Sequence, residues 1–308
     1  MSNTVASKNK LLSSLVKNRY IYLLLLPGTV YYLLFCYFPM YGVTLAFKQF
    51  QISQGILWSP WIGLDNFREI FRLPDFWTAV GNTLVISLQR LLIEFPVPIL
   101  LALLINEVMS NRLKRFFQTV FTFPNFLSWI VVSGIVFSLL SDGGTVNRLL
   151  ATFGMEKQTL LMDPAFFRPL LYLSNVWKAA GWTSIIYLAA ISSINPELYE
   201  SAIIDGAGRF KQTLHITWPG IRSTAAILLI LAVGNIMNAG FDQIFNMYNV
   251  SVYNVADIID TYIFRRTFQL GSDFGTSTAV GLFKSVINAV LLFGANYIVK
   301  LFGEESLL

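Results

Sequence analysis

Long runs of apolar residues, separated by shorter polar segments, are the dominant pattern of this chain. A helix needs about 20 predominantly apolar residues to cross the hydrocarbon core of a bilayer. The pattern therefore predicts an all-α polytopic membrane protein whose six transmembrane helices span residues near 20–46, 79–105, 116–140, 170–193, 223–247 and 277–300.

The composition agrees with this fold class. Hydrophobic residues make up 55% of the 308 residues and charged residues 13%, whereas a soluble domain is about 25% charged. The first apolar run extends well beyond the core of a signal peptide, so we expect an uncleaved anchor. Neither repeats nor low-complexity linkers divide the chain. We therefore predict one transmembrane domain, residues 20–308, after an N-terminal tail, residues 1–19.

Lysine and arginine are concentrated in three alternating segments. These segments carry Lys8, Lys10, Lys17 and Arg19 in the tail, Arg112, Lys114 and Arg115 in the second loop, and Arg209, Lys211 and Arg222 in the fourth. The positive-inside rule places these segments and both termini in the cytoplasm, and loops 47–78, 141–169 and 248–276 outside. This topology accounts for most of the net charge of +5, so no nucleic-acid partner is predicted.

Signatures of catalysis are absent from the sequence. It has no HExxH, GxSxG, CxxC or GxxxxGK[ST] motif, and His215 and Cys36 are the only residues of their types. A lone histidine offers no second ligand for a metal site, and one cysteine forms no internal disulfide. We therefore expect no enzyme and no bound cofactor, and any nucleotide chemistry must reside on another chain.

The segment ELYESAIIDGAGRFKQTLHITWPGI, residues 197–221, is the conspicuous polar interruption between apolar runs. Asn195 followed by Pro196 is a helix-start signal. We expect a short helix to about Asp205, a stop at Gly206, and a second short helix that ends at Pro219. Small side chains on this cytoplasmic loop, about 195–221, would let a partner surface approach closely.

This loop resembles the E-A-A-x3-G-x9-I-x-L-P pattern of binding-protein-dependent ABC importer permeases. The resemblance is carried by Glu200, Ser201, Ala202, Gly206, Ile216, Trp218 and Pro219, together with the DGA formed by Asp205, Gly206 and Ala207. Ser201 replaces alanine and Trp218 replaces leucine. Segments 37–50, 63–67, 143–150 and 176–182 are similar to those of the LplB-like carbohydrate permeases, a branch that includes one subunit of alginate importers.

The resemblance implies the type I ABC importer permease fold and a location in the bacterial cell membrane. It implies a second, related permease subunit, two ATPase subunits that bind ATP and Mg²⁺, and an extracytoplasmic solute-binding lipoprotein. The helix around Glu200 would sit in a cleft of an ATPase, and its movement would switch the permease between inward-facing and outward-facing states. The first span would pack across the partner permease.

The fifth predicted span carries a polar stripe. Its members Asn235, Asn238, Asp242, Asn246 and Asn249 would share one face of a continuous helix. Polar groups in a spanning helix turn toward the bundle interior or a watery cavity. We expect the stripe to line the translocation pathway, with Phe241, Phe245 and Tyr248 offering apolar faces to a sugar ring. Hydrogen bonding between helices is the alternative role.

Other charges lie within the predicted spans. Lys178, Asp242 and Lys284 should fall in the outer half of the membrane, where two lysines could suit an acidic sugar or snorkel toward headgroups. Arg90 and Glu94 lie four residues apart, and we predict that they pair structurally.

We therefore expect a permease subunit that imports a sugar or oligosaccharide. The alternatives are the same fold serving an amino acid or a peptide, or a membrane enzyme or channel that acts alone. A docking helix argues against the last of these.

Overall fold

The computed structural model describes residues 17–269, 271 and 273–301. Residues 1–16 of the predicted tail, including Lys8 and Lys10, and the C-terminal residues 302–308 lie outside the described residues. The cytoplasmic placement of both termini therefore stays a prediction. Among the described residues the regular structure is helical, apart from one isolated bridge between Lys48 and Trp61.

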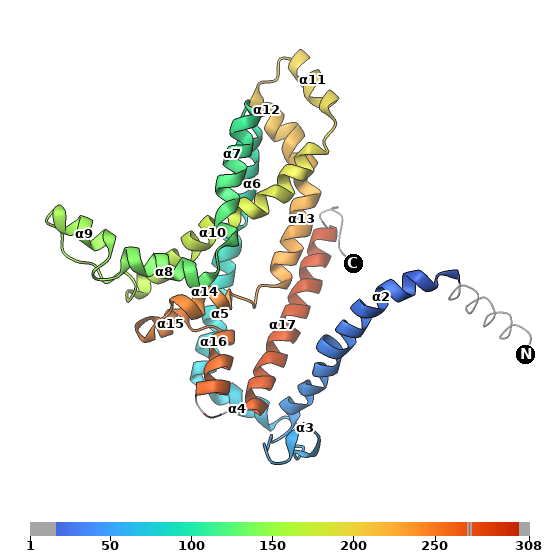
Figure 1. Ribbon diagram of the computed structural model, residues 1–308, viewed down its shortest axis with the longest axis vertical. Coiled ribbons are helices and arrows are strands. Elements are labelled where there is room, and N and C mark those ends of the chain that lie inside the picture. The colour runs from blue at the N-terminus through green and yellow to red at the C-terminus, as the bar shows by residue number, and fades with distance from the viewer. Residues whose placement is uncertain (1–16, 270, 272, 302–308) are drawn as a thin grey trace, which may run out of the picture. The chain divides into compact units, whose positions relative to one another are not determined.

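Figure 1 shows these elements. In chain order they are α2 (Arg19–Tyr32), η1 (Leu33–Tyr37), η2 (Phe38–Phe47), α3 (Gly55–Trp58), α4 (Asp65–Arg72), α5 (Pro74–Glu94), α6 (Pro96–Asn106), α7 (Asn111–Thr122), η3 (Phe123–Phe126), α8 (Trp129–Leu140), α9 (Thr145–Thr152), α10 (Pro164–Ser192), α11 (Pro196–Ile204), α12 (Arg209–Gln212), η4 (Thr213–Thr217), α13 (Trp218–Gly234), α14 (Phe241–Met247), η5 (Val250–Val252), α15 (Tyr253–Ala256), α16 (Ile259–Phe264), η6 (Arg265–Gln269) and α17 (Phe274–Leu301).

Five helical stretches in the described part of the chain are long and apolar enough to cross a membrane. They are Arg19–Phe47, Pro74–Asn106, Trp129–Thr152, Arg209–Gly234 and Phe274–Leu301. The helix α10 is not one of these five, although its 29 residues exceed the roughly 20 that a crossing needs. The all-α membrane fold is confirmed, and the count of six spans stays a prediction.

The chain forms two compact units, and the smaller one comprises the described residues up to Phe67 together with Phe274–Ala279. In this unit the first apolar helix leads into a loop organised by Lys48. The Nζ of this buried lysine donates to the backbone oxygens of Ile56 and Leu57 at 2.8 and 3.1 Å and lies 4.8 Å from the centre of the Trp61 ring. These contacts satisfy the charge within the loop. No residue of α2 is buried.

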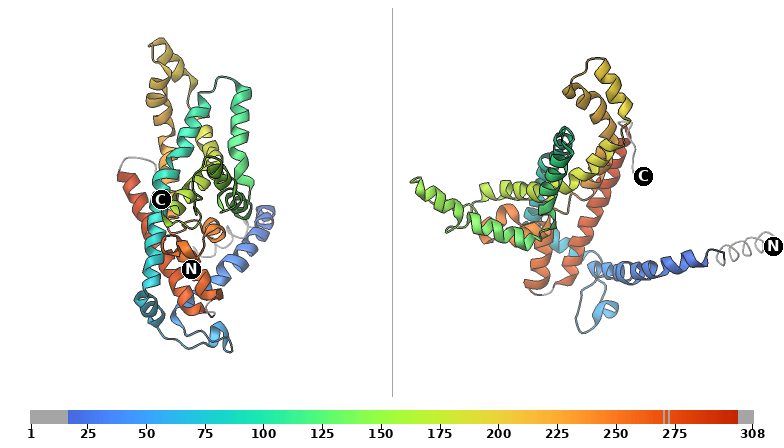
Figure 2. Two further views of the ribbon diagram at one scale, coloured as in Figure 1. Left: turned by 90° about the vertical axis from the view of Figure 1, so that its left-hand side faces the viewer. Right: turned by 45° about the horizontal axis from the view of Figure 1, so that its top comes forward.

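The larger unit holds the remaining helices, and α10 packs against α5, α6, α7 and α13 within it. Figure 2 shows that α10 crosses these helices. It also shows α11 beyond the end of α13 that begins at Trp218. A Cβ on Gly181 of α10 would collide with the backbone of Phe121 on α7. Small residues allow such close helix approaches in membranes. Tyr187 of α10 is buried in the same region with Ile191 and Ile221.

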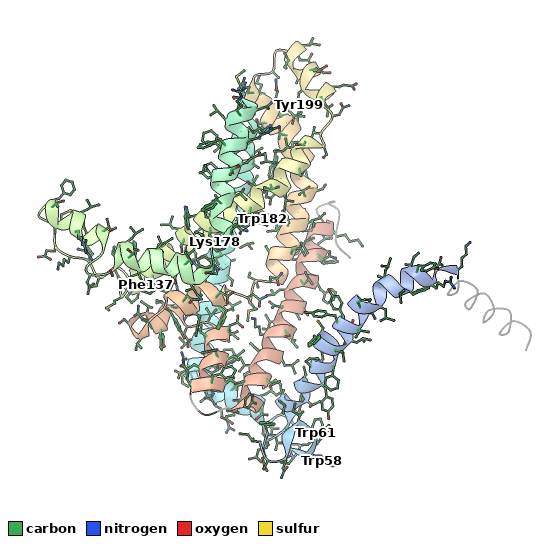
Figure 3. The ribbon with its side chains drawn as sticks, in the orientation of Figure 1. Trp58, Trp61, Phe137, Lys178, Trp182 and Tyr199 are labelled. Carbon is green, nitrogen blue, oxygen red and sulfur yellow. The ribbon has the colours of Figure 1, made fainter. Side chains whose placement is uncertain are left out.

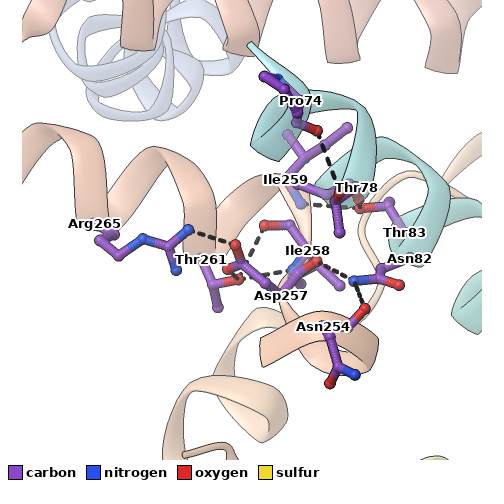
Figure 4. Close-up of polar contacts among 11 residues, drawn as sticks. Pro74, Thr78, Asn82, Thr83, Asn254, Asp257, Ile258, Ile259, Thr261 and Arg265 are labelled. Atoms are coloured by element: carbon purple, nitrogen blue, oxygen red, sulfur yellow. Dashed lines mark hydrogen bonds and ion pairs between the residues drawn. The ribbon is translucent and has the colours of Figure 1, made fainter. Parts of the chain in front are cut away.

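A buried polar network joins α5 to the segment that precedes α16 (Figure 4). The Nδ2 of Asn82 donates to the backbone oxygens of Asn254 and Asp257, both at 3.1 Å. The carboxylate of Asp257 in turn accepts from Thr261 at 2.7 Å and from Arg265 at 2.5 Å. Because buried polar groups need partners, this network fixes the segment between α14 and α16.

The third predicted span, 116–140, is not one helix. The helix α7 ends at Thr122, the short helix η3 contains Pro124, and α8 starts anew at Trp129, where the Oγ of Ser128 accepts from the N–H of Val131. The apolar candidate span in this part of the chain is Trp129–Thr152. The proline and the Ser128 cap outweigh the continuous apolar pattern.

The predicted stop at Pro219 is also wrong. The apolar helix runs through this residue, from Arg209 to Gly234. Within this stretch a π turn, η4, directly precedes α13, and the N–H of Trp218 donates to the carbonyl of Thr213, five residues back. Proline lacks an N–H, and its ring meets the carbonyl four residues earlier in an α-helix. The wider π turn lets the helix continue through the proline.

The fifth predicted span, 223–247, is broken. The helix α13 ends at Gly234, and α14 begins at Phe241 after Gly240, whose φ is 88°. Non-helical backbone at membrane depth is tolerated where it is buried in protein or lines a cavity. The polar stripe therefore does not share one helix face, because its first two members lie in the unwound segment.

Candidate functional site

The helix α11 is the predicted short helix of the 195–221 loop, and its ends match the expected signals. The Oδ1 of Asn195 caps its start by accepting from the N–H of Glu197 at 3.1 Å. At its end, Gly206 has φ 75°, its N–H donates to the carbonyl of Ile203 at 3.0 Å, and the N–H of Ala207 donates to that of Ala202 at 2.8 Å. These paired bonds form a Schellman motif.

The surface of α11 is open to a partner. Ile204 is 85% exposed and Leu198 is 52% exposed. Among the residues of the predicted motif, Glu200, Ser201, Asp205, Gly206 and Pro219 are exposed, while Ala202, Ala207 and Ile216 are half-buried. Figure 3 labels Tyr199 on α11. Its hydroxyl and that of Thr217 in η4 lie 2.9 Å apart. This contact ties the exposed helix to the base of α13.

A cavity of about 310 Å³ lies inside the larger unit, and we call it the inner cavity. The helices α5, α6, α10 and α13 and the unwound segment after α13 line it. Its polar lining residues are Ser87, Arg90, Glu94, Asn175, Thr183, Tyr187, Asn235 and Asn238. Two members of the predicted stripe, Asn235 and Asn238, therefore face this cavity.

A second cavity of about 580 Å³, the outer cavity, lies beside α14 and α16. It is lined by Trp129, Asn238, Gly240, Phe241, Asp242, Asp260, Ile263, Phe264 and Phe268. The rings of Phe241 and Phe264 have centroids 6.0 Å apart. Asn238 is common to both cavities, so the segment around it lies between them.

The stripe therefore divides into two groups. Asn235, Asn238, Phe241 and Asp242 line the cavities, whereas Asn246 and Phe245 are not lining residues of either cavity. The Nδ2 of Asn246 instead donates to the backbone oxygen of Asp242 at 2.7 Å. Phe245 packs on Phe264 with ring centroids 4.7 Å apart. The pathway role of these residues stays a prediction.

Both predicted outer lysines have partners inside the protein. The Nζ of Lys284 lies 2.6 and 2.9 Å from the two carboxylate oxygens of Asp260. The Nζ of Lys178 donates to the backbone oxygen of Asn125 at 2.9 Å and lies 5.5 Å from the centre of the Trp129 ring. Asp260 therefore offsets the charge of Lys284 beside the outer cavity.

A buried polar cluster at the inner cavity is larger than the predicted Arg90–Glu94 pair. The Nε of Arg90 and the Oε1 of Glu94 lie 3.6 Å apart, which confirms the pairing. In addition Arg90 donates to the Oε1 of Gln243, and Asn175 donates to Glu94 at 2.5 Å. Gln243 was not among the residues predicted from the sequence, although a glutamine within an apolar run is a usable signal.

The described residues contain no group of three or more His, Cys, Asp or Glu side chains that could hold a metal ion. The polar groups that line the two cavities are hydroxyl, amide, carboxylate and guanidinium groups, and aromatic rings lie beside them.

Comparisons with known proteins bear on this arrangement. Residues 94–303 match the family described as "Binding-protein-dependent transport system inner membrane component". The polygalacturonan/rhamnogalacturonan transport system permease protein YteP of Bacillus subtilis (strain 168) is 45% identical over 301 residues, covering 97% of this chain and 94% of the relative. Protein LplB of the same strain is 44% identical over 297 residues, covering 96% and 93%.

The solved structure of a bacterial alginate ABC transporter, in complex with an alginate pentasaccharide-bound periplasmic protein, contains a similar chain. The TM-score is 0.89 at 39% identity, over 97% of this chain and 100% of that chain. A second structure, of a bacterial ABC transporter involved in alginate import, gives a TM-score of 0.87 at 41% identity, over 94% and 98%. This chain therefore belongs to the binding-protein-dependent transport system inner membrane components, as a multi-pass membrane permease subunit of an ABC importer.

Proposed function

We propose that this permease imports an oligosaccharide through the inner and outer cavities, past the segment Asn235–Gly240. The observation that carries the proposal is that Asn238 lines both cavities. Asparagine amides and carboxylates match the donors and acceptors of sugar hydroxyls, and aromatic side chains offer flat apolar surfaces. The names of the similar proteins, which refer to polygalacturonan, rhamnogalacturonan and alginate, support a saccharide.

In this proposal α11 docks on a separate ATPase subunit. Its exposed apolar residues Leu198, Ile203 and Ile204 would enter a cleft of that subunit, with Glu200 on the same short helix. Since Tyr199 contacts Thr217 at the base of α13, movement of α11 would reach the helix that ends at the inner cavity. A second permease subunit and an extracytoplasmic solute-binding lipoprotein complete the proposed transporter.

Reconstitution into liposomes tests the proposal. The chain is combined with the second permease, the ATPase and the solute-binding lipoprotein of its own transport system. Uptake of labelled oligogalacturonides and of a neutral galactooligosaccharide is then measured with and without ATP. We expect ATP-dependent accumulation of at least one saccharide by the complete complex and none by this chain alone. Accumulation by the isolated chain, or amino acid or peptide uptake in place of saccharide uptake, would contradict the proposal.

A further inference from the structure

Arg90 occupies a position that its pairing with Glu94 does not explain. Its side chain is only 14% exposed, at the inner cavity. The Nε of Arg90 and the Oε1 of Glu94 are buried without a hydrogen-bond partner among the described residues, although they lie 3.6 Å apart. An ionic side chain within a membrane protein is costly. The orientation of the guanidinium is therefore set by contacts other than this ion pair.

One such contact is with Gln243 on α14, which is completely buried. Its Nε2 donates to the backbone oxygen of Leu171 at 2.7 Å and to the Oγ of Ser174 at 2.8 Å, both on α10. These two bonds fix the amide, so that its Oε1 faces Arg90 and accepts from it. The guanidinium is thereby attached to a rigid point on α10 and α14.

The other contact is with Gly240, where α14 begins. A Cβ on this glycine would overlap the Nη1 of Arg90 and lie 2.9 Å from its Cζ, closer than Cβ atoms approach in real structures, and it would be in tight contact with the Nη2 at 3.0 Å. The guanidinium thus fills the space that a side chain at this position would occupy. It packs against the left-handed turn, φ 88°, that ends the unwound segment.

The same segment is held from α17. The N–H of Met237 donates to the Oδ1 of Asn288 at 3.1 Å, which satisfies one backbone donor released by the break in the helix. Arg90 and Asn288 therefore hold the backbone on the two sides of Asn238, the residue shared by both cavities.

We infer that Arg90 is a positioning residue of the translocation pathway, which braces the unwound segment Asn235–Gly240 so that Asn238 faces both cavities. Glu94 serves as its counter-charge and is itself held by Asn175. The inference rests on the proposed function, because it assigns Arg90 a role in placing a residue of that pathway.

The first test uses Arg90→Lys in the reconstituted transporter. Lysine keeps the positive charge beside Glu94 but lacks the planar fork that contacts Gln243 and Gly240 together. A single cysteine is placed at Asn238 in a Cys36→Ser background, and its reaction rate with a small hydrophilic thiol reagent is measured. We expect Arg90→Lys to change this rate several-fold and to raise the KM of saccharide uptake.

Arg168→Lys is the matched control. Arg168 also bridges two elements of the larger unit, donating to Asn82 at 2.9 Å and to the backbone oxygen of Val255 at 3.0 Å, but it lines neither cavity. Arg168→Lys should leave the thiol reaction rate of the cysteine at position 238 unchanged. If both lysine variants lower the Tm and leave that rate equal, Arg90 is only structural and the inference is overturned.

A double-mutant cycle tests the contact itself. Arg90→Ala removes the group that a Cβ at position 240 would meet, so the Tm loss of Arg90→Ala with Gly240→Ala should be smaller than the sum of the two single losses. Additive losses would contradict the contact. An unreactive cysteine at position 238 in the parent complex would instead remove the proposed pathway and the inference with it. A cysteine at position 238 that is reactive, but whose rate does not change in Arg90→Lys, would overturn the inference and leave the proposed pathway standing.

Discussion

Gly206 and Gly240 have the same left-handed backbone, but different contacts hold the two turns. Gly206, φ 75°, closes α11, and a Cβ built there meets no atom within 4 Å. Gly240, φ 88°, opens α14, and its Cβ position is filled by Arg90 of α5. Neighbouring backbone groups hold the first turn, whereas side chains from distant helices hold the second. The end of α11 is thus encoded by residues close in sequence, whereas the segment between the cavities depends on tertiary structure.

The largest difference should appear when valine replaces each glycine. A left-handed backbone costs a β-branched residue on the order of 1–3 kcal/mol at either site. Only at Gly240 must the new side chain also displace a buried, hydrogen-bonded arginine. We expect Gly240→Val to abolish the peak of the folded permease in size-exclusion chromatography without the ATPase, and Gly206→Val to retain it. Equal yields would show that the two turns tolerate side chains alike.

The coupling prediction concerns α11 alone. Gly206→Val should displace the end of the helix, and Glu200→Ala should remove a charged contact to the ATPase. Both variants should insert and fold, and Glu200→Ala should retain the parental Tm, because these positions are exposed. We expect weakened assembly with the ATPase or the loss of transport-coupled ATP hydrolysis, measured in liposomes. Parental coupling in both variants would remove this loop from the mechanism.

The pathway prediction concerns Asn238 and Asp242. Replacing either with alanine should remove one or two hydrogen bonds to the saccharide, each worth about 1–3 kcal/mol, and lower uptake about tenfold or more. Assembly should be unaffected.

Asn246→Ala is the control for the pathway variants, because Asn246 lines neither cavity. Uptake by this variant should stay close to that of the parent. A loss equal to that of Asn238→Ala would mean that the polar residues act together as packing contacts between helices.

The smallest effect is expected at the surface ion pair between Arg209 and Glu107. Its atoms lie 3.8 Å apart, and the two side chains are 60% and 41% exposed. Exposed pairs contribute about 0–1 kcal/mol. Glu107→Ala should therefore shift the Tm of the complex only slightly and leave uptake intact. A strong loss of coupling would show that this contact transmits movement from α12.

The comparison also explains what the sequence could predict. The sequence predicts α11 with its Asn195 cap and its Gly206 stop, because each signal lies within a few residues of the feature that it determines. The break in the fifth apolar run could not be predicted in this way, because it depends on Arg90 and Asn288, which lie on other helices. The predicted helix end at Pro219 was wrong because the π turn that accommodates this proline has no distinctive local signal in the sequence.

Cysteine reactivity across the segment between the cavities shows directly whether the translocation pathway runs past it. In a Cys36→Ser background, single cysteines at Asn235, Asn238 and Asp242 are treated with a small hydrophilic thiol reagent in the assembled complex, with and without trapped ATP. Ile230 and Ile244, both 0% exposed, are buried controls, and Leu231, 43% exposed and lining neither cavity, is an exposed one. Ile236 does not serve as a control because it lines the inner cavity.

We expect fast reaction at the three polar positions and slow reaction at the controls. The rates at the polar positions should change when ATP is trapped, since alternating access exposes the same site to each side in turn. Rates at positions 235, 238 and 242 that match those of the controls in every nucleotide state would contradict a pathway past this segment and place it elsewhere.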